Sequence, residues 1–286
     1  MPYCVLLAYH FVFNKKIAMA LIDTFFETVK LPSISEVTHA LIRTLEQDEV
    51  SVAHVRDLIE QDPALSAHIL RLANSAHFGL PRGISTIDDA IAMVGISKVR
   101  TLAVGACLNV SFASIHGLDR KEFWNSSLAC AGYAQWLAHG VGIDGQMAWL
   151  TGMMLRLGEL LIAQTEPALL EEIERQPHSP GIRWQREKTL VGFTEGQITA
   201  ELARRWNFPM QIVQALQRSA EPMTEQAFSR LGAILHLAEL ITETPHADAQ
   251  VVDSLPQDVM DALKLDSHWL RSTFPQSAQF TNFHDT

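Results

Sequence analysis

Apolar positions recur every three or four residues along most of the chain. One series runs through Ile34, Val37, Leu41 and Leu45, and a longer one extends from Glu225 to Ile241. Side chains at this spacing lie on one face of an α-helix, so each series predicts a helix with one buried face. No segment shows the convincing alternation that predicts a β-strand. We therefore expect an all-α protein.

Capping residues mark the ends of several predicted helices. Asp62 precedes Pro63, and its carboxylate can accept hydrogen bonds from the free backbone N–H groups of a first turn. Proline at the first helical position loses no useful hydrogen bond. Gly95 follows the short helix expected at 85–94 and ends it.

The predicted helices divide into two blocks. The first covers residues 31–112 and the second residues 122–241, with one continuous helix expected at Met147–Ala163. Residues 171–187 are polar and contain Pro177, Pro180 and Gly181, which predicts an exposed loop or loosely packed segment. Residues 1–30 form an arm with a first helix, and residues 242–286 form a polar tail with one short helix near 256–263.

Composition narrows the functional classes. The apolar content is 48%, enough for a substantial core, and the net charge of −10 argues against direct nucleic-acid binding. The apolar start of the chain is too short to span a bilayer, and Lys15 and Lys16 follow it, which is the wrong order for a signal peptide. We expect a cytoplasmic protein without a membrane span. The start is either a docking arm or an over-extended reading of a chain that begins at Met19.

The three cysteines are far apart in the sequence. Cys4, Cys107 and Cys130 form no C-x-x-C pair. They are expected to be free thiols in a reducing compartment, with a zinc site or catalytic thiol as the minor alternative.

Four segments together resemble the HDOD domain, a helical bacterial signalling module related to HD-type phosphohydrolases. They are Leu31–Ile34, Ile59–Leu65 (I-E-Q-D-P-A-L), Leu70–Ser75 (L-R-L-A-N-S) and Ile87–Gly95. The resemblance extends over about residues 31–241 and implies an HD-like multi-helix bundle, with the first block packed on an HD-like second block. Its signature residues, with structural or partner-binding roles, are Asp62, Pro63, Asn74, Ser75 and Gly95.

The resemblance also locates the positions that hold metal ligands in HD-type enzymes. The His-Asp pair falls on Leu155 and Arg156 within the segment Thr151–Leu160. Leucine has no donor atom and arginine is a permanent cation, so neither can bind a metal there. The other degenerate positions are Ser126, Glu195, Arg218, Ser219 and Glu239. Glu195, His236 and Glu239 could still act as ligands, provided that they converge. The resemblance implies no catalytic residue, metal or cofactor.

These residues favour a non-catalytic signalling protein that acts through protein–protein contacts, at an apolar groove between the blocks or through the N-terminal arm. The resemblance implies a link to two-component or cyclic-dinucleotide signalling, with a kinase, receiver or phosphodiesterase protein as partner; a homodimer is compatible with it. One alternative is a sensor in which Arg156 binds a small anion or nucleotide, unless Arg156 pairs with Glu159 or Glu195. A second alternative is residual metal-dependent phosphohydrolase activity.

Overall fold

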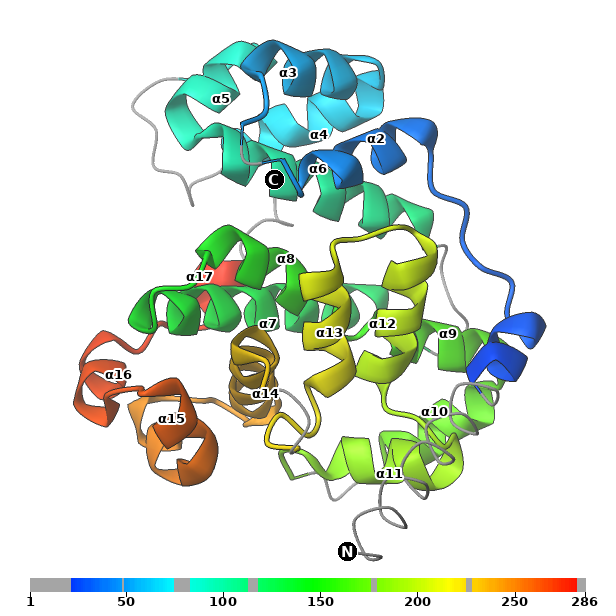
Figure 1. Cartoon of the computed structure of the whole chain (residues 1–286), viewed down its shortest axis with the longest axis vertical. Helices are drawn as coiled ribbons and strands as arrows, with labels where there is room; N and C mark the ends of the chain where they lie inside the picture. Colours follow the sequence, from blue (N-terminus) through cyan, green and yellow to red (C-terminus); the bar gives the residue numbers. More distant parts are fainter. Residues whose placement is uncertain are drawn as a thin grey trace, which may run out of the picture.

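The computed structural model describes residues 22–47, 49–74, 83–112, 118–175, 179–224 and 228–281. Within these ranges all regular structure is helical, which confirms the all-α prediction. The first block lies at the top of Figure 1. It consists of α2 (Glu36–Thr44), α3 (Val52–Glu60), α4 (Pro63–Ala73), α5 (Ile87–Val94) and α6 (Ile96–Ser111).

The capping residues act as their sequence positions predict. The Asp62 carboxylate accepts hydrogen bonds from the backbone N–H groups of Ala64, at 2.9 Å, and Leu65, at 3.1 Å. Pro63 is the first residue of α4. Gly95 joins α5 to α6 with φ of 93°, a conformation that side chains with a Cβ rarely adopt. The first block is therefore held in part by local backbone chemistry.

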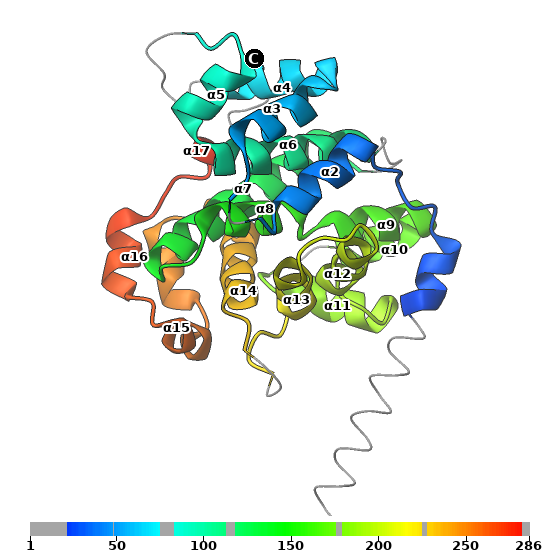
Figure 2. The ribbon, with the colours of Figure 1, turned by 45° about the horizontal axis from the view of Figure 1, so that its top comes forward.

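The second block surrounds the long helix α7 (Arg120–Gly140), which packs against α8 (Gly145–Met154) and α14 (Arg230–Glu243). Its other helices are α9 (Leu157–Thr165), α10 (Pro167–Ile173), α11 (Ile182–Leu190), α12 (Glu195–Arg205) and α13 (Met210–Arg218). Helix α6 packs on α8 and joins the two blocks, as the turned view in Figure 2 shows. Buried apolar residues of both blocks form one connected core.

Two predictions for the second block are wrong. The expected single helix at Met147–Ala163 is two helices, α8 and α9, broken at Leu155 and Arg156. The expected loop at 171–187 contains the end of α10 and much of α11, and Arg183 is only 1% exposed. Pro180 and Gly181 do interrupt the chain, but they lie immediately before a buried helix. Pro177 lies outside the described residues.

The tail contains more structure than its sequence suggests. It forms η1 (Ala249–Ser254), α15 (Gln257–Leu263), α16 (Ser267–Thr273) and α17 (Ala278–Thr281), of which only α15 was predicted. Trp269 of α16 stacks on Trp136 of α7 with ring centroids 5.6 Å apart. Phe280 of α17 packs over Gly132, where a Cβ would lie 2.2 Å from the ring. These short helices depend on contacts with α7, which local sequence does not reveal.

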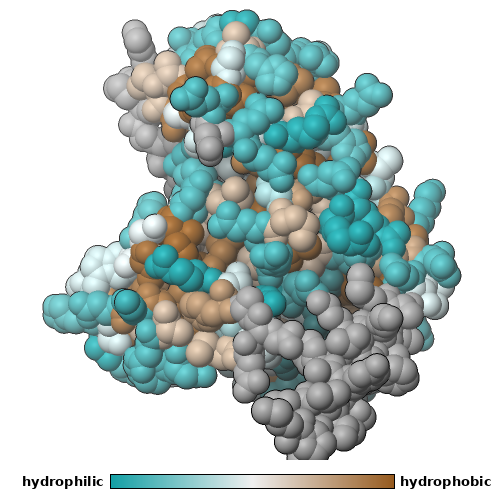
Figure 3. All heavy atoms as spheres, in the orientation of Figure 1, coloured by the Kyte–Doolittle hydropathy of each residue, from teal (hydrophilic) through white to brown (hydrophobic). Residues whose placement is uncertain are grey.

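At the N-terminal side, residues 22–28 form the predicted first helix, and residues 1–21 lie outside the described part of the chain. Asp23 of this helix pairs with Arg205 at 3.2 Å. The face seen in Figure 3 is mainly hydrophilic, with hydrophobic atoms in separate patches. None of the described helices has the length and hydrophobicity to cross a bilayer.

Candidate functional site

The break between α8 and α9 forms the centre of the candidate site. Leu155 ends α8 and Arg156 precedes α9. Thr199 of α12 satisfies the backbone of the break: its hydroxyl donates to the carbonyl of Leu155 at 2.9 Å and accepts from the N–H of Gly158 at 2.7 Å. A Cβ on Gly158 would lie 2.2 Å from the carbonyl oxygen of Glu195, so only glycine allows this approach. The break is therefore a built feature of the bundle.

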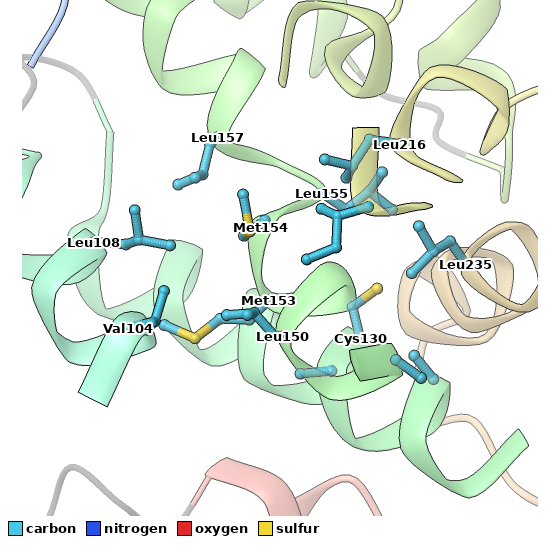
Figure 4. Close-up of a cluster of buried hydrophobic side chains, with 14 of the residues drawn as sticks. Val104, Leu108, Cys130, Leu150, Met153, Met154, Leu155, Leu157, Leu216 and Leu235 are labelled. Carbon is cyan, nitrogen blue, oxygen red and sulfur yellow. The ribbon is translucent and has the colours of Figure 1, made fainter. Parts of the chain in front are cut away.

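Leu155 is part of the hydrophobic core. It is fully buried, and Figure 4 shows it among Cys130, Leu216 and Leu235. Burial raises the pKa of the Cys130 thiol well above its ordinary value, and the nearby Glu239 raises it further. Cys130 is thus a neutral packing residue, and Cys107 is also a free thiol. Cys4 lies outside the described residues. At the position expected for a metal-binding histidine, the Leu155 side chain makes apolar contacts.

The next residue, Arg156, does not join this apolar group and instead forms an ion pair. Its Nη2 atom lies 2.7 Å from Oε2 of Glu159, and its guanidinium lies over the ring of Phe123 at 5.8 Å. Burial alone would lower the pKa of Arg156, and Arg183 acts in the same direction. The surrounding carboxylates outweigh both effects and raise it. Of the two roles expected for Arg156, anion binding and pairing with a glutamate, the structure shows pairing with Glu159.

The other acidic positions converge, but on an arginine. Nη2 of Arg183 lies 2.8 Å from Oε1 of Glu195 and also contacts Oε1 of Glu239. Trp184 adds an indole N–H hydrogen bond to the same oxygen of Glu195 at 3.2 Å. All three charged side chains are at most 1% exposed. The two acidic residues that the degenerate site retains thus bind a guanidinium from α11.

Further carboxylates complete a buried ionic cluster around Arg183. Nε lies 3.3 Å from Glu243 and 3.9 Å from Glu187, and Nη1 lies 3.4 Å from Glu159 and 3.6 Å from Glu174. Within the described part of the chain, two arginines therefore share six glutamates that come from α9, the end of α10, α11, α12 and α14. We call this set the Arg183 cluster.

Burial in the Arg183 cluster raises the pKa of several of its carboxyl groups. Burial raises the pKa of Glu187 to about 8, although Arg183 opposes the shift. Burial also raises the pKa of Glu195 and Glu243 against the same opposition. Removing a carboxylate from water is the main cause, and repulsion from the neighbouring carboxylates adds to it.

A metal ion does not fit this arrangement. A hard divalent cation needs several converging oxygen or imidazole ligands, and the described residues contain no group of three or more acidic, histidine or cysteine side chains with that geometry. His236 stacks on Trp184 with centroids 4.9 Å apart, and its Nδ1 pairs with the backbone oxygen of Ser219 at 2.8 Å. Burial lowers the pKa of His236, which keeps the ring neutral at physiological pH.

The remaining degenerate positions lie around this region. Ser126 lines a cavity of about 480 Å³ together with Arg156 and Glu159. Arg218 is the last residue of α13. Ser219 is buried, and its hydroxyl donates to the carbonyl of Leu216 at 2.9 Å.

The family-signature residues form a separate, structural group in the first block. Asp62, Pro63 and Gly95 shape helix ends, as described above. Asn74 ends α4, accepting a hydrogen bond from the N–H of Ile84 at 2.6 Å and donating to its carbonyl at 2.7 Å. Asn74 thereby ties α4 to the segment that leads into α5. Ser75 lies outside the described residues.

Sequence reasoning missed Arg183, Trp184, Glu187 and Glu243. One signal was present: Arg183 and Glu187 are four residues apart and flank a tryptophan, which is typical of one helix face. Their burial could not be predicted from the local sequence, because the partners of Arg183 on α14 lie 56 and 60 residues further along the chain.

The chain is similar to several known proteins. The family model of the HDOD domain matches residues 31–222. An uncharacterized protein of Treponema pallidum (strain Nichols) is 25% identical over 276 residues, which are 92% of this chain and 51% of that protein. The cyclic di-GMP phosphodiesterase CdgJ of Vibrio cholerae serotype O1 is 31% identical over 136 residues, which are 46% of this chain and 30% of that protein. The chain thus spans about half or less of these two relatives.

Similarity in structure extends over nearly the whole chain. A Shewanella amazonensis protein whose name places it among the phosphohydrolases has a TM-score of 0.74 and 27% identity, with 92% of this chain and 96% of that chain covered. The helical architecture is thus shared with HD-like phosphohydrolase folds, while the family model covers well over half of the sequence. The chain belongs to the HDOD domain family.

Proposed function

We propose that this chain is a non-catalytic signalling module that acts by binding other proteins. The observation that carries the proposal is the state of the His-Asp position, where Leu155 is fully buried in the core and Arg156 is ion-paired with Glu159. Neither side chain can bind or activate a metal-bound water. The similarity to a cyclic di-GMP phosphodiesterase supports a link to cyclic-dinucleotide or two-component signalling.

The groove between the two blocks is a suitable contact point for a partner. A small cavity of about 50 Å³ lies between α4 and α6 on one side and α7 and α8 on the other. Its lining is largely apolar and includes Leu72, Leu102, Trp124, Leu128 and Met153. A cavity of this size accepts part of one apolar side chain, so a partner would place a single anchor there.

The alternative of an anion or nucleotide sensor has little support. The cavity beside Arg156 is lined by five carboxylate side chains, Asp119, Glu122, Glu159, Glu171 and Glu174, against one arginine. Arg156 is already engaged by two of them. A phosphate would meet repulsion from several sides.

Enzyme assays with metal analysis test the proposal. We expect the full chain, purified without chelator, to contain no stoichiometric transition metal and to hydrolyse no cyclic dinucleotide when Mg²⁺ or Mn²⁺ is added. Chelator-sensitive turnover would refute it. Cyclic di-GMP should leave the Tm of wild type and Arg156→Ala unchanged, whereas a shift seen only in wild type would favour the sensor.

Binding measurements test the contact with a partner. Purified receiver, kinase and phosphodiesterase proteins from the same organism would be titrated against wild type and Leu72→Asp. We expect one of them to bind wild type and to lose affinity at least tenfold with the variant. Met93→Asp, at an exposed position in the same block, is the matched control and should bind normally. Equal affinity for all three chains would exclude the groove.

A further inference from the structure

The guanidinium of Arg183 occupies the point on which the retained acidic positions converge. Glu195 and Glu239 come from α12 and α14, two elements that are separate in sequence, and both contact the same Nη2 atom. Glu243 and Glu159 approach the other guanidinium nitrogens at 3.3 and 3.4 Å. A positive charge therefore lies at the centre of the carboxylates of the Arg183 cluster, which is the electrostatic arrangement of a cation site.

The Arg183 cluster is not fully hydrogen-bonded in the described structure, and Nε of Arg183 itself has no hydrogen-bond partner. One carboxylate oxygen on each of Glu187, Glu195, Glu239 and Glu243 is buried and has no hydrogen-bond partner in the described structure. Each of these side chains is at most 4% exposed. Two of these oxygens, on Glu243 and Glu187, lie 3.3 and 3.9 Å from Nε of Arg183. Buried polar atoms are normally hydrogen-bonded, so carboxylates that face the guanidinium without being satisfied by it indicate a site with spare capacity for a cation.

We propose that Arg183 is a tethered cation that takes the place of a metal ion, and that the carboxylates around it form a cation site able to bind free guanidinium once the arginine side chain is removed. A cation supplied by the chain cannot dissociate, so α9, α11, α12 and α14 remain joined whatever the supply of metal. The proposal extends the non-catalytic function, since it explains what fills the centre of the degenerate site.

Chemical rescue of Arg183→Ala tests the proposal directly. Removing one partner of a buried ionic cluster should lower the Tm by on the order of 10 °C. A few millimolar guanidinium, far below denaturing concentrations, should then raise the Tm of the variant by several degrees and leave wild type unchanged. Urea is the neutral isostere and should give no rescue at the same concentration.

Controls separate this site from general effects. Arg204→Ala removes an arginine that pairs with Glu201 at an exposed position of α12, so its Tm should be nearly normal and insensitive to guanidinium. A folded Arg183→Ala variant that does not respond to guanidinium would refute the proposal. So would a guanidinium response of wild type equal to that of the variant. Turnover by wild type would instead refute the non-catalytic function.

A second pair of variants covers the case in which Arg183→Ala does not fold. Arg183→Lys keeps the positive charge, whereas Arg183→Gln keeps a polar side chain without the charge. We expect Arg183→Lys to retain the higher Tm of the two. Equal Tm values, or an Arg183→Gln variant as stable as wild type, would show that the cluster does not require a cation.

Discussion

Replacing Glu187 by glutamine should remove a large part of the pH dependence of stability. The carboxyl group lies on α11, is fully buried, and accepts a hydrogen bond from the backbone N–H of Glu195 at 2.8 Å. Its second oxygen has no partner in the described structure, and Nε of Arg183 is 3.9 Å away. Glutamine can accept the same backbone hydrogen bond without the charge, so the substitution isolates ionisation from packing.

The magnitude follows from the pKa of the group. Burial raises the pKa of Glu187 from its ordinary 4.5 to about 8, which corresponds to about 5 kcal/mol in the free energy of unfolding. Because folding raises this pKa, the stabilising contribution is complete below pH 4.5 and is lost as the pH rises through about 8. Between these limits the loss is about 1.4 kcal/mol per pH unit. The raised pKa values of Glu195 and Glu243 act in the same direction.

Urea unfolding of wild type and Glu187→Gln at intervals from pH 5 to pH 8 would measure this difference. We expect wild type to lose about 1.4 kcal/mol more per pH unit than the variant. Glu201→Gln is the control: hydrogen bonds from Arg204 and Arg205 overcome partial burial and lower the pKa of Glu201, so it remains ionised over this range. Parallel pH profiles for wild type and Glu187→Gln would refute the reasoning.

Other substitutions test packing around the site. Gly158→Ala should destabilise the chain by about 3 kcal/mol in urea unfolding, because the new Cβ would lie 2.2 Å from the carbonyl oxygen of Glu195. Gly83→Ala, whose nearest atom would be 3.7 Å away, is its near-neutral control. Asn74→Ala should cost about 1–3 kcal/mol by the same measurement, since both backbone groups of Ile84 lose their partner. A chelator should leave the Tm of wild type unchanged in calorimetry, and a clear decrease would contradict the expectation that the fold needs no metal.

The sequence predicts the helices whose signals are local. A short helix is predicted near 256–263, where α15 spans Gln257–Leu263, and Asp62 and Gly95 mark helix ends correctly. A capping side chain and a left-handed glycine act within a few residues, so no knowledge of the fold is needed. The short helices of the tail lack such independence, since α16 and α17 are positioned by Trp136 and Gly132 of α7.

Helix α11 shows why the rest of the site could not be predicted from the sequence. Arg183 and Glu187 look like residues of a solvated segment, because isolated charges are rarely buried. Their burial becomes favourable only when Glu195, Glu239 and Glu243 approach from two other helices. That information lies in tertiary contacts, whereas the polar residues of 171–187, together with Pro180 and Gly181, by themselves predict a loop.

The same contacts limit how the degenerate site can change. Restoring only the His-Asp pair, with Leu155→His and Arg156→Asp, would place new ligands beside carboxylates that already pair with Arg183. It would also put a polar ring into an apolar core and remove one of the two arginines that pair with the six glutamates. The double variant should therefore lose stability without gaining a metal. Arg156, Glu195 and Glu239 are linked to Arg183 of α11 through one set of ion pairs, so a change at one of them requires compensation at the others.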